Sequence, residues 1–418
     1  MEEPKVNRAQ VSSLANRLAD EKEAPRHGVH SFHRYFGKLI PGIPRFAVKH
    51  FSEPGDVVLD PFCGSGTTLV EAMLEKRRAI GVDINPLATF IAKVKTTPIP
   101  RDDLDRALTE ILWFWRSNRD LDTDSHVPYV VNIDHWFRPE VKRDLLSLRT
   151  AIMQTPTSAT KDFFLAAFSA FIRSVSNADP QHVFPGYSKR MRALDAAGRL
   201  IDVEASFLRA ARKRILQVSS LDPTSPRPTL LNGSLEEQKI ADGSVDLVVT
   251  NPPYISSIRY LETMKIEMGW LDMIASQSQY LQMDRLVTGT ERFYKPELQS
   301  LNSTGIETVD VLSQLIFSEN PKMAKTVSEY FRRMRTTFVE LSRLLRPGGH
   351  LVIKISDSKV RSQVIRTPEI FVEICENLGF VLVENFIDEF DKNSRSLLTA
   401  RNTYSGLMTY DHVLVLKR

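Results

Sequence analysis

The 418-residue sequence predicts an α/β fold: a Rossmann-like, mostly parallel seven-stranded sheet with helices on both faces, interrupted by a helical insertion. Short apolar runs, each long enough for a buried strand, alternate with segments whose apolar residues recur at helical spacing. Two of the runs end in loops rich in glycine or proline. In such folds ligands bind at the carboxyl ends of the strands, so these two loops are the first candidates for a site.

Seven apolar runs are predicted to form the strands. Val57–Leu59 and Val245–Thr250 precede the two candidate loops. Both are rich in branched apolar residues, which is typical of strands that are covered on both faces. The other runs are Ala79–Asp83, Thr229–Asn232, His350–Ile355, Phe380–Val383 and His412–Leu416.

Helices are predicted where helical spacing coincides with start or stop residues. One begins directly after the first loop, at Thr67–Met73. Another begins at Asn85-Pro86, because a proline in the first turn loses no hydrogen bond. A long amphipathic helix is expected over Lys325–Leu345, ended by the turn Arg346–Gly349, and a last one over Pro368–Leu378.

Changes in pattern divide the chain into segments. Residues 1–26 are polar and are predicted to form an N-terminal arm or a first helix. Residues 101–228 show helical spacing without strand alternation, which predicts a mostly helical insertion that ends in the proline-rich linker Asp222–Pro228. Residues 27–100 and 229–418 form one α/β domain, and within it residues 255–320 have little periodicity.

The composition is that of an ordinary globular protein, and a reducing cytoplasm is the expected location. Net charge is +4 and the sequence pI is near 8.9, which permits a nucleic-acid partner without requiring one. No apolar run reaches the length of a membrane span, and the polar start lacks a secretory signal. Cys63 and Cys375 provide neither a disulfide framework nor a zinc ligand set, and His27, His30 and His33 have no partner cluster. No metal is therefore expected.

The first loop, Asp60–Gly66, has the features of a site for a nucleotide-like cofactor. Gly64 and Gly66 remove side chains where a ligand would touch backbone, and the following helix N-terminus offers free N–H groups to a carboxylate. Asp83 ends the next strand, where a carboxylate can accept hydrogen bonds from both ribose hydroxyls. The alternative is a tight structural turn with a surface Asp. A phosphate-binding P-loop is disfavoured, because no Gly-Lys-Ser/Thr follows.

The second loop, Asn251-Pro252-Pro253-Tyr254, suits chemistry on an exocyclic amino group. Such a nitrogen is conjugated with its ring and is a poor nucleophile. The Asn251 amide oxygen and the Pro252 carbonyl could accept its N–H groups and free its lone pair, while proline stiffens both acceptors. The Tyr254 ring could stack on a base turned out of its helix. The alternative is a proline turn that only ends the strand.

Together the two loops resemble those of the DNA amino-methyltransferases, which use S-adenosylmethionine (SAM) to methylate adenine N6 or cytosine N4. The stretches His33–Pro41 and Pro54–Phe62 resemble the segments that this family places before and at its cofactor strand. The resemblance implies a methyltransferase domain over residues 27–100 and 229–418. It also implies an antiparallel final strand at Val413–Leu416.

The resemblance also implies which residues bind and react. The catalytic set is Asn251, Pro252, Pro253 and Tyr254, and no metal takes part. The cofactor set lies in four segments around the two predicted loops. Its members are Phe36, Lys38, Pro41, Asp60, Pro61, Phe62, Cys63, Gly64, Gly66, Thr67, Asp83, Ile84, Asn232, Gly233 and Ser234.

Adenine N6 is slightly favoured as the target, with cytosine N4 as the alternative. In this family Asn or Asp at the first position of the catalytic tetrapeptide is typical of adenine enzymes, whereas Ser is typical of cytosine enzymes. Asn251 therefore favours adenine. However, Ile255–Tyr260 and Met268–Trp270 resemble the context found in several cytosine-N4 enzymes. Attack on cytosine carbon 5 is disfavoured, because it needs a reactive cysteine at the target.

Double-stranded DNA is the expected partner, and the family allows a cognate restriction endonuclease in the same system. Residues 186–214 are rich in Lys and Arg, which could contact phosphates; the alternative is a solvated helix face. Residues 255–320 are the candidate target-recognition segment. The predicted DNA-binding residues are Lys189, Arg190, Arg209, Arg212, Lys213, Arg259 and Arg285.

Two other functions share these motifs. An RNA or protein-glutamine methyltransferase could carry the same catalytic loop, but no accessory RNA-binding domain is evident and His33–Pro41 favours DNA. A scaffold that keeps the fold without the chemistry is disfavoured, because Asp83 and the whole catalytic tetrapeptide are present.

Overall fold

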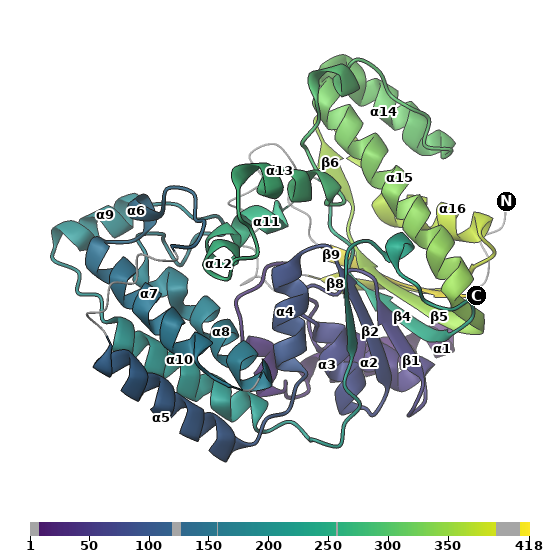
Figure 1. Ribbon diagram of the computed structural model, residues 1–418. Coiled ribbons are helices and arrows are strands. Elements are labelled where there is room, and N and C mark those ends of the chain that lie inside the picture. The colour runs from purple at the N-terminus through teal and green to yellow at the C-terminus, as the bar shows by residue number, and fades with distance from the viewer. Residues whose placement is uncertain (1–7, 119–126, 157, 256–257, 390–409) are drawn as a thin grey trace.

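The computed structural model describes residues 8–118, 127–156, 158–255, 258–389 and 410–418 (Figure 1). Part of the predicted N-terminal arm and two residues of the 255–320 segment lie outside these ranges. The predicted fold class is confirmed. A seven-stranded sheet has the order β3-β2-β1-β4-β5-β9-β8. Its strands are β1 (Val57–Asp60), β2 (Arg78–Asp83), β3 (Thr229–Asn232), β4 (Val245–Thr250), β5 (Leu345–Ile355), β8 (Val381–Glu389) and β9 (Tyr410–Lys417).

The sheet is parallel from β3 to β5, and β9 is antiparallel to both of its neighbours. From β1 the chain first adds β2 and β3 on one side and later β4 and β5 on the other. The strand order therefore reverses between β1 and β4. In open sheets of this kind the ligand crevice lies at the carboxyl ends of the strands at such a reversal.

Strand residues alternate between two apolar cores, one on each face of the sheet. Val57 and Leu59 pack with one core and Val58 with the other. One face is covered by α2 (Gly42–Phe51), α3 (Thr67–Leu74) and α4 (Pro86–Lys95), and α1 (Arg8–Glu23) packs on α2. The other face is covered by α15 (Pro321–Leu344) and α16 (Thr367–Asn377). The sheet is thus buried on both faces, as its apolar strands require.

The segment 101–228 is helical where it is described. It contains α5 (Arg101–Ser117), α6 (Ile133–Trp136), α7 (Pro139–Met153), α8 (Ser158–Ile172), α9 (Lys189–Ala196) and α10 (Val203–Val218). All of these helices except α9 contribute to a third core, in which Phe168 meets Trp270 edge to face with ring centroids 5.8 Å apart. Trp270 belongs to the segment that follows the catalytic loop. The insertion is therefore packed against that segment and holds it in place.

The segment after the catalytic loop forms short helices before the long one. These are α11 (Tyr260–Thr263), α12 (Lys265–Trp270), α13 (Gln277–Leu286) and α14 (Glu307–Glu319). The long helix α15 begins four positions earlier than predicted, because the Asn320 side chain caps it by accepting from the Met323 N–H. The turn Arg346–Gly349 is absorbed into β5 as an irregularity in its pairing with β4. The small hairpin β6 (Ser358–Val360) and β7 (Gln363–Ile365) was not predicted.

Candidate active site

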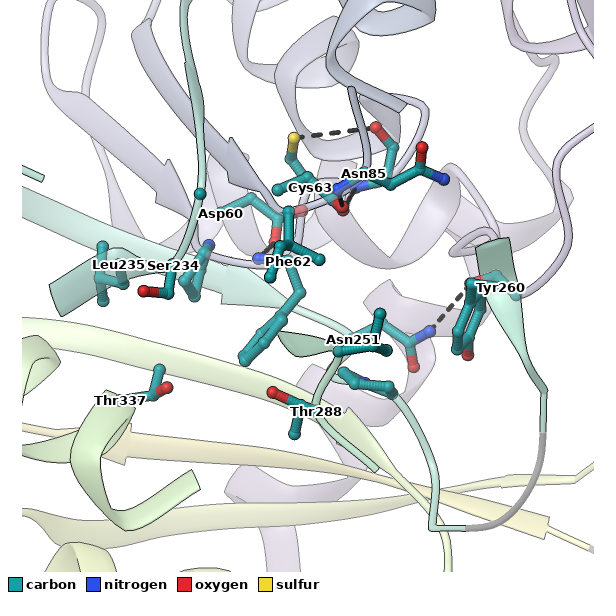
Figure 2. Close-up of a pocket in the computed structure, with 18 of the residues that line it drawn as sticks. Asp60, Phe62, Cys63, Asn85, Ser234, Leu235, Asn251, Tyr260, Thr288 and Thr337 are labelled. Carbon is teal, nitrogen blue, oxygen red and sulfur yellow. Dashed lines mark hydrogen bonds between the residues drawn. The ribbon is translucent and has the colours of Figure 1, made fainter. Parts of the chain in front are cut away.

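A cavity of about 370 Å³ opens at the carboxyl ends of β1, β2 and β4 (Figure 2). Asp60, Asp83 and Asn251 reach it from the ends of these three strands. The opposite wall comes from residues 286–288 and from α15. This is the size of an ordinary small-molecule site, and it lies at the reversal of strand order where the fold predicts one.

The first loop brings backbone to the cavity because its glycines adopt conformations that other residues avoid. Gly66 has φ of +76° and is the N-cap of α3, and a Cβ there would lie 2.8 Å from the Ala92 Cβ. Gly64 has φ of +48°, and a Cβ there would meet the Tyr35 ring at 3.0 Å. The loop is therefore fixed closely between α4 and Tyr35.

The Asp83 carboxylate is held at the edge of the cavity by two backbone N–H groups. Its Oδ2 accepts from Gly64 N at 2.8 Å, and its Oδ1 accepts from Asn85 N at 2.8 Å. Burial raises the pKa of Asp83 to about 6, against the lowering effect of these hydrogen bonds. Each oxygen keeps further acceptor capacity, so the carboxylate can still receive hydroxyl groups of a ligand.

Asp60, which is buried, links the two predicted loops through hydrogen bonds. Its Oδ1 accepts from the Thr250 hydroxyl at 2.8 Å and from the Phe62 N–H at 3.1 Å. Burial raises the pKa of Asp60 to about 6. Because Thr250 directly precedes Asn251, this hydrogen bond fixes the cofactor loop relative to the catalytic loop.

Asn251 lines the cavity and carries an acceptor without a partner among the described residues. Its Nδ2 donates to the Gly37 carbonyl at 2.9 Å, a bond drawn as a dashed line in Figure 2. Its Oδ1 is buried and has no hydrogen-bond partner among the described residues. An unsatisfied buried carbonyl costs about 1–3 kcal/mol, and in native proteins such a group often marks a functional site. Asn251 therefore keeps an acceptor for one hydrogen bond beside the cavity.

Tyr254 is anchored on the far side of the catalytic loop. Its hydroxyl makes a hydrogen bond with Asp411 Oδ1 at 3.1 Å, and Asp411 is also paired with Lys354. Burial and the nearby Asp411 carboxylate raise the pKa of Tyr254 well above its usual value. The side chain is therefore a neutral, fixed ring that ties the catalytic loop to β9 and β5.

The sequence of this chain is similar to those of known proteins. Residues 16–93 match the model of a family described as "DNA methylase", of the N6/N4 methyltransferase type. Over 93% of its length the chain is 26% identical to the Type II methyltransferase M.MvaI of Kocuria varians and covers 90% of that protein. Over 90% of its length it is 22% identical to the Type II methyltransferase M.BsoBI of Geobacillus stearothermophilus and covers 81% of it. These matches support a DNA amino-methyltransferase.

The cofactor of this methyltransferase is SAM, and the cavity fits it. A molecule with a ribose and a carboxylate finds the Asp83 acceptor and the start of α3 within one cavity, with Gly64 leaving backbone accessible between them. The described residues contain no group of three or more side chains that could hold a metal ion. Nor is any helix among them both long and apolar enough to cross a membrane.

Most of the predicted cofactor residues of the methyltransferase line the cavity, and some lie just behind it. Phe36, Pro41, Gly66 and Asn232 are not in its wall. Of the catalytic set, Asn251 and Pro253 line it, whereas Pro252 and Tyr254 do not. The residue-level roles stay predictions. The residues in the wall are Lys38, Asp60, Pro61, Phe62, Cys63, Gly64, Thr67, Asp83, Ile84, Gly233 and Ser234.

Sequence reasoning did not place two parts of the wall. Tyr35 directly precedes the stretch Phe36–Pro41 that the resemblance implied, and Thr336 and Thr337 belong to α15. The α15 residues recur with the helix period, but that period indicates only which side of the helix is buried and not that this side meets a ligand. Tyr35 could have been suggested by its place within the His33–Pro41 resemblance.

The predicted DNA-binding residues do not share one environment. Arg209, Arg212 and Lys213 are exposed on α10, which Figure 1 shows along the lower side of the insertion, whereas α9 lies at its upper edge. Arg190 on α9 is paired with Asp179 at 2.5 Å, and Lys189 beside it is exposed. Arg259 and Arg285 follow the catalytic loop and are paired with glutamates, Glu262 and Glu297.

Proposed function

We propose that this methyltransferase moves the SAM methyl group to an exocyclic amino nitrogen of a base turned out of duplex DNA at specific sequences. The observation that carries the proposal is Asn251 Oδ1, a buried acceptor without a partner among the described residues, on a side chain that lines the same cavity as Asp83. An amide oxygen held in this way is an acceptor for an N–H group and has no role in a purely structural turn.

The catalytic loop would act by drawing the amino group out of conjugation with its ring. Asn251 Oδ1 accepts one N–H, while Nδ2 stays on the Gly37 carbonyl and prevents the amide from rotating. The Pro252 carbonyl is the second proposed acceptor, and Pro253 forms part of the wall. When bound, SAM supplies the activated methyl group. The protein supplies the relative position of the two reactants, which alone can lower a barrier by about 7–11 kcal/mol.

Adenine N6 is the proposed target, because Asn251 stands at the first position of the tetrapeptide. Cytosine N4 is the second candidate, favoured by the context of Met268–Trp270. In the structure Met268 and Trp270 are fully buried, so they shape the support of the loop and do not touch a base in the cavity. They therefore leave the choice of base to the loop itself.

One experiment identifies the product. The protein is incubated with labelled SAM and, in separate reactions, duplex DNA, RNA or a protein mixture, and the products are digested for mass spectrometry. We expect N6-methyladenine from DNA, whereas N4-methylcytosine would support the second candidate. Label only in RNA or in glutamine, or 5-methylcytosine in DNA, would contradict the proposed function.

Residues 27–100 and 229–418 are proposed as the catalytic domain, with residues 255–320 recognising the target and residues 101–228 supporting them. The packing of Trp270 into the core of the insertion supports this division of roles. A cognate restriction endonuclease is the proposed partner in the cell. Protection of DNA from that nuclease after methylation would test the pairing.

The basic side of α10 is proposed to contact phosphates. Replacing Arg209, Arg212 and Lys213 together by Gln should weaken binding to every duplex alike, because phosphate contacts carry no sequence information. The slope of log affinity against log salt should become shallower by up to about 2.7, since each contact contributes about 0.9. Binding titrations at four salt concentrations measure it.

A matched control neutralises three cations at the edge of the sheet where the parallel strands begin, opposite the cavity. These are Arg78, Arg346 and Lys417, all exposed. This triple variant should keep the wild-type slope. Equal slopes for the wild type and the α10 variant would show that these three side chains do not contact phosphates and that α10 only presents a solvated surface.

Tyr254 is proposed to support the base through its ring. Tyr254→Ala should raise the KM for duplex DNA about 5- to 150-fold, from the loss of about 1–3 kcal/mol of stacking. Tyr254→Phe should keep most of the activity and lose only the hydrogen bond to Asp411, about 1 kcal/mol of stability. Steady-state kinetics and urea unfolding separate the two effects. A folded Phe variant as impaired as the Ala variant would assign the role to the hydroxyl.

A further inference from the structure

The loop Asp179–Ser188 joins the insertion to the mouth of the cavity and has no role in the function described so far. It comes after α8 and the short turn Arg173–Val175, and it ends where α9 begins. The Arg259 guanidinium lies 5.5 Å from the Phe184 ring centroid, and the neighbouring residues Tyr260 and Leu261 line the cavity. The loop therefore lies next to the place where a target base would enter.

Two arginines fix the loop backbone to the segments that build the site. Arg34 donates to the Pro180 carbonyl at 2.7 Å and to the His182 carbonyl. Arg173 donates to the carbonyls of His182 and Val183 at 3.4 and 3.3 Å, and to Thr263 of α11 at 2.8 Å. Arg34 directly precedes Tyr35, which lines the cavity. The loop is thus attached to both sides of the cavity entrance.

Asp179 holds the loop together by hydrogen bonds to other loop residues and to Arg190. Its carboxylate accepts from the Gln181 N–H at 2.9 Å, the Ser188 hydroxyl at 2.6 Å and Arg190 at 2.5 Å, and its own N–H donates to the Gly186 carbonyl. Asp179 is 1% exposed. So many bonds to a buried carboxylate, whose pKa they hold well below its usual range, make a rigid loop. A rigid loop loses little conformational entropy when it binds.

The tip of this rigid loop presents polar side chains to solvent. Gln181 is exposed, and its side chain takes no part in the hydrogen bonds of the described residues. The His182 side chain is 54% exposed, and its Nε2 lies 4.0 Å from Asp179 Oδ2. Lys189 follows at the start of α9 and is also exposed. Amide and imidazole groups can pair with base edges in a groove, and a cation beside them suits the phosphate backbone.

We propose that the loop Asp179–Ser188 reads base edges of the DNA next to the methylated base, with Gln181 and His182 as the reading side chains. The proposal rests on the proposed function, since it specifies how the same substrate is recognised. It assigns sequence specificity to a loop of the insertion, in addition to the 255–320 segment.

The test uses the full chain and a pool of duplexes with random sequence. The pool is methylated with SAM and the modified positions are sequenced for wild type, Gln181→Ala and His182→Ala. Each variant should methylate the same base but lose about 5- to 150-fold of its discrimination at one or two neighbouring positions, the value of a good side-chain contact to a base. SAM affinity should not change, which also confirms that the variants are folded.

Gln154→Ala, at the exposed end of α7, is the matched control and should keep the wild-type preference. Unchanged discrimination in both loop variants would overturn the proposal. So would a uniform loss on all sequences, because it would make the loop a phosphate contact. Wild-type protein that methylates no amino group in any duplex would overturn the proposed function itself, which keeps the two failures distinct.

Discussion

Asn251→Ala is expected to reduce methyl transfer about 100- to 1000-fold, the usual cost of removing one preorganised hydrogen-bonding group from an active site. The variant loses the Asn251 side-chain oxygen, which is a buried acceptor without a partner among the described residues. SAM affinity should stay within about twofold, because Asp83 and the first loop hold the cofactor and Asn251 faces the target. The loss should therefore fall on kcat and not on the KM for SAM.

Single-turnover rates with duplex DNA and calorimetry with SAM measure the two quantities. Asn377→Ala is the matched control, since Asn377 is exposed at the end of α16, away from the cavity. Full activity in Asn251→Ala would rule out the amide acceptor. A large loss of SAM affinity would instead assign Asn251 to the cofactor.

The strands and the two loops could be predicted because their signals are local. Apolar runs such as Val245–Thr250 determine the strands, and the glycines of Asp60–Gly66 determine a conformation that only glycine adopts readily. Because parallel strands end at one edge, the two loops had to meet there. The contact between Asp60 and Thr250 is one consequence, although no local pattern shows it.

Contacts between residues far apart in the chain could not be predicted from the sequence. Tyr254 was predicted only to stack on a base, yet its hydroxyl also holds Asp411, far along the chain and on the antiparallel strand β9. No spacing rule joins a loop residue to a residue in a strand that is added last. The cavity wall formed by α15 was missed for a similar reason, since amphipathic spacing indicates a buried side and not what lies against it.

The number of basic residues in a segment predicted the DNA-binding side chains least well. Residues 186–214 are strongly basic in sequence, but Arg190 and Arg199 are paired with Asp179 and Asp195, and Arg214 is buried against Phe32. A guanidinium that is already paired or buried adds little to the field that phosphates feel. Only the folded arrangement separates such residues from the exposed cations Arg209, Arg212 and Lys213 on α10.

Asp83→Ala is expected to weaken SAM binding about 5- to 150-fold, corresponding to about 1–3 kcal/mol for a charged hydrogen-bond partner. The variant removes the ribose acceptor and also frees the N–H groups of Gly64 and Asn85 that the carboxylate now holds. Asp83→Asn should lose nearly as much. Either orientation of its amide places an NH₂ group against one of these two N–H donors, so one of the two bonds must break.

Calorimetry across pH gives the sharpest form of this test. Burial raises the pKa of Asp83 to about 6, and protonation removes acceptor capacity. Wild-type affinity for SAM should therefore fall as the pH drops through about 6, by up to about tenfold per pH unit. Asp83→Ala should lack this contribution, whereas Asp102→Ala, an exposed carboxylate on α5, should keep both the affinity and its pH dependence. Unchanged SAM affinity in folded Asp83→Ala protein would show that the ribose is held elsewhere in the cavity.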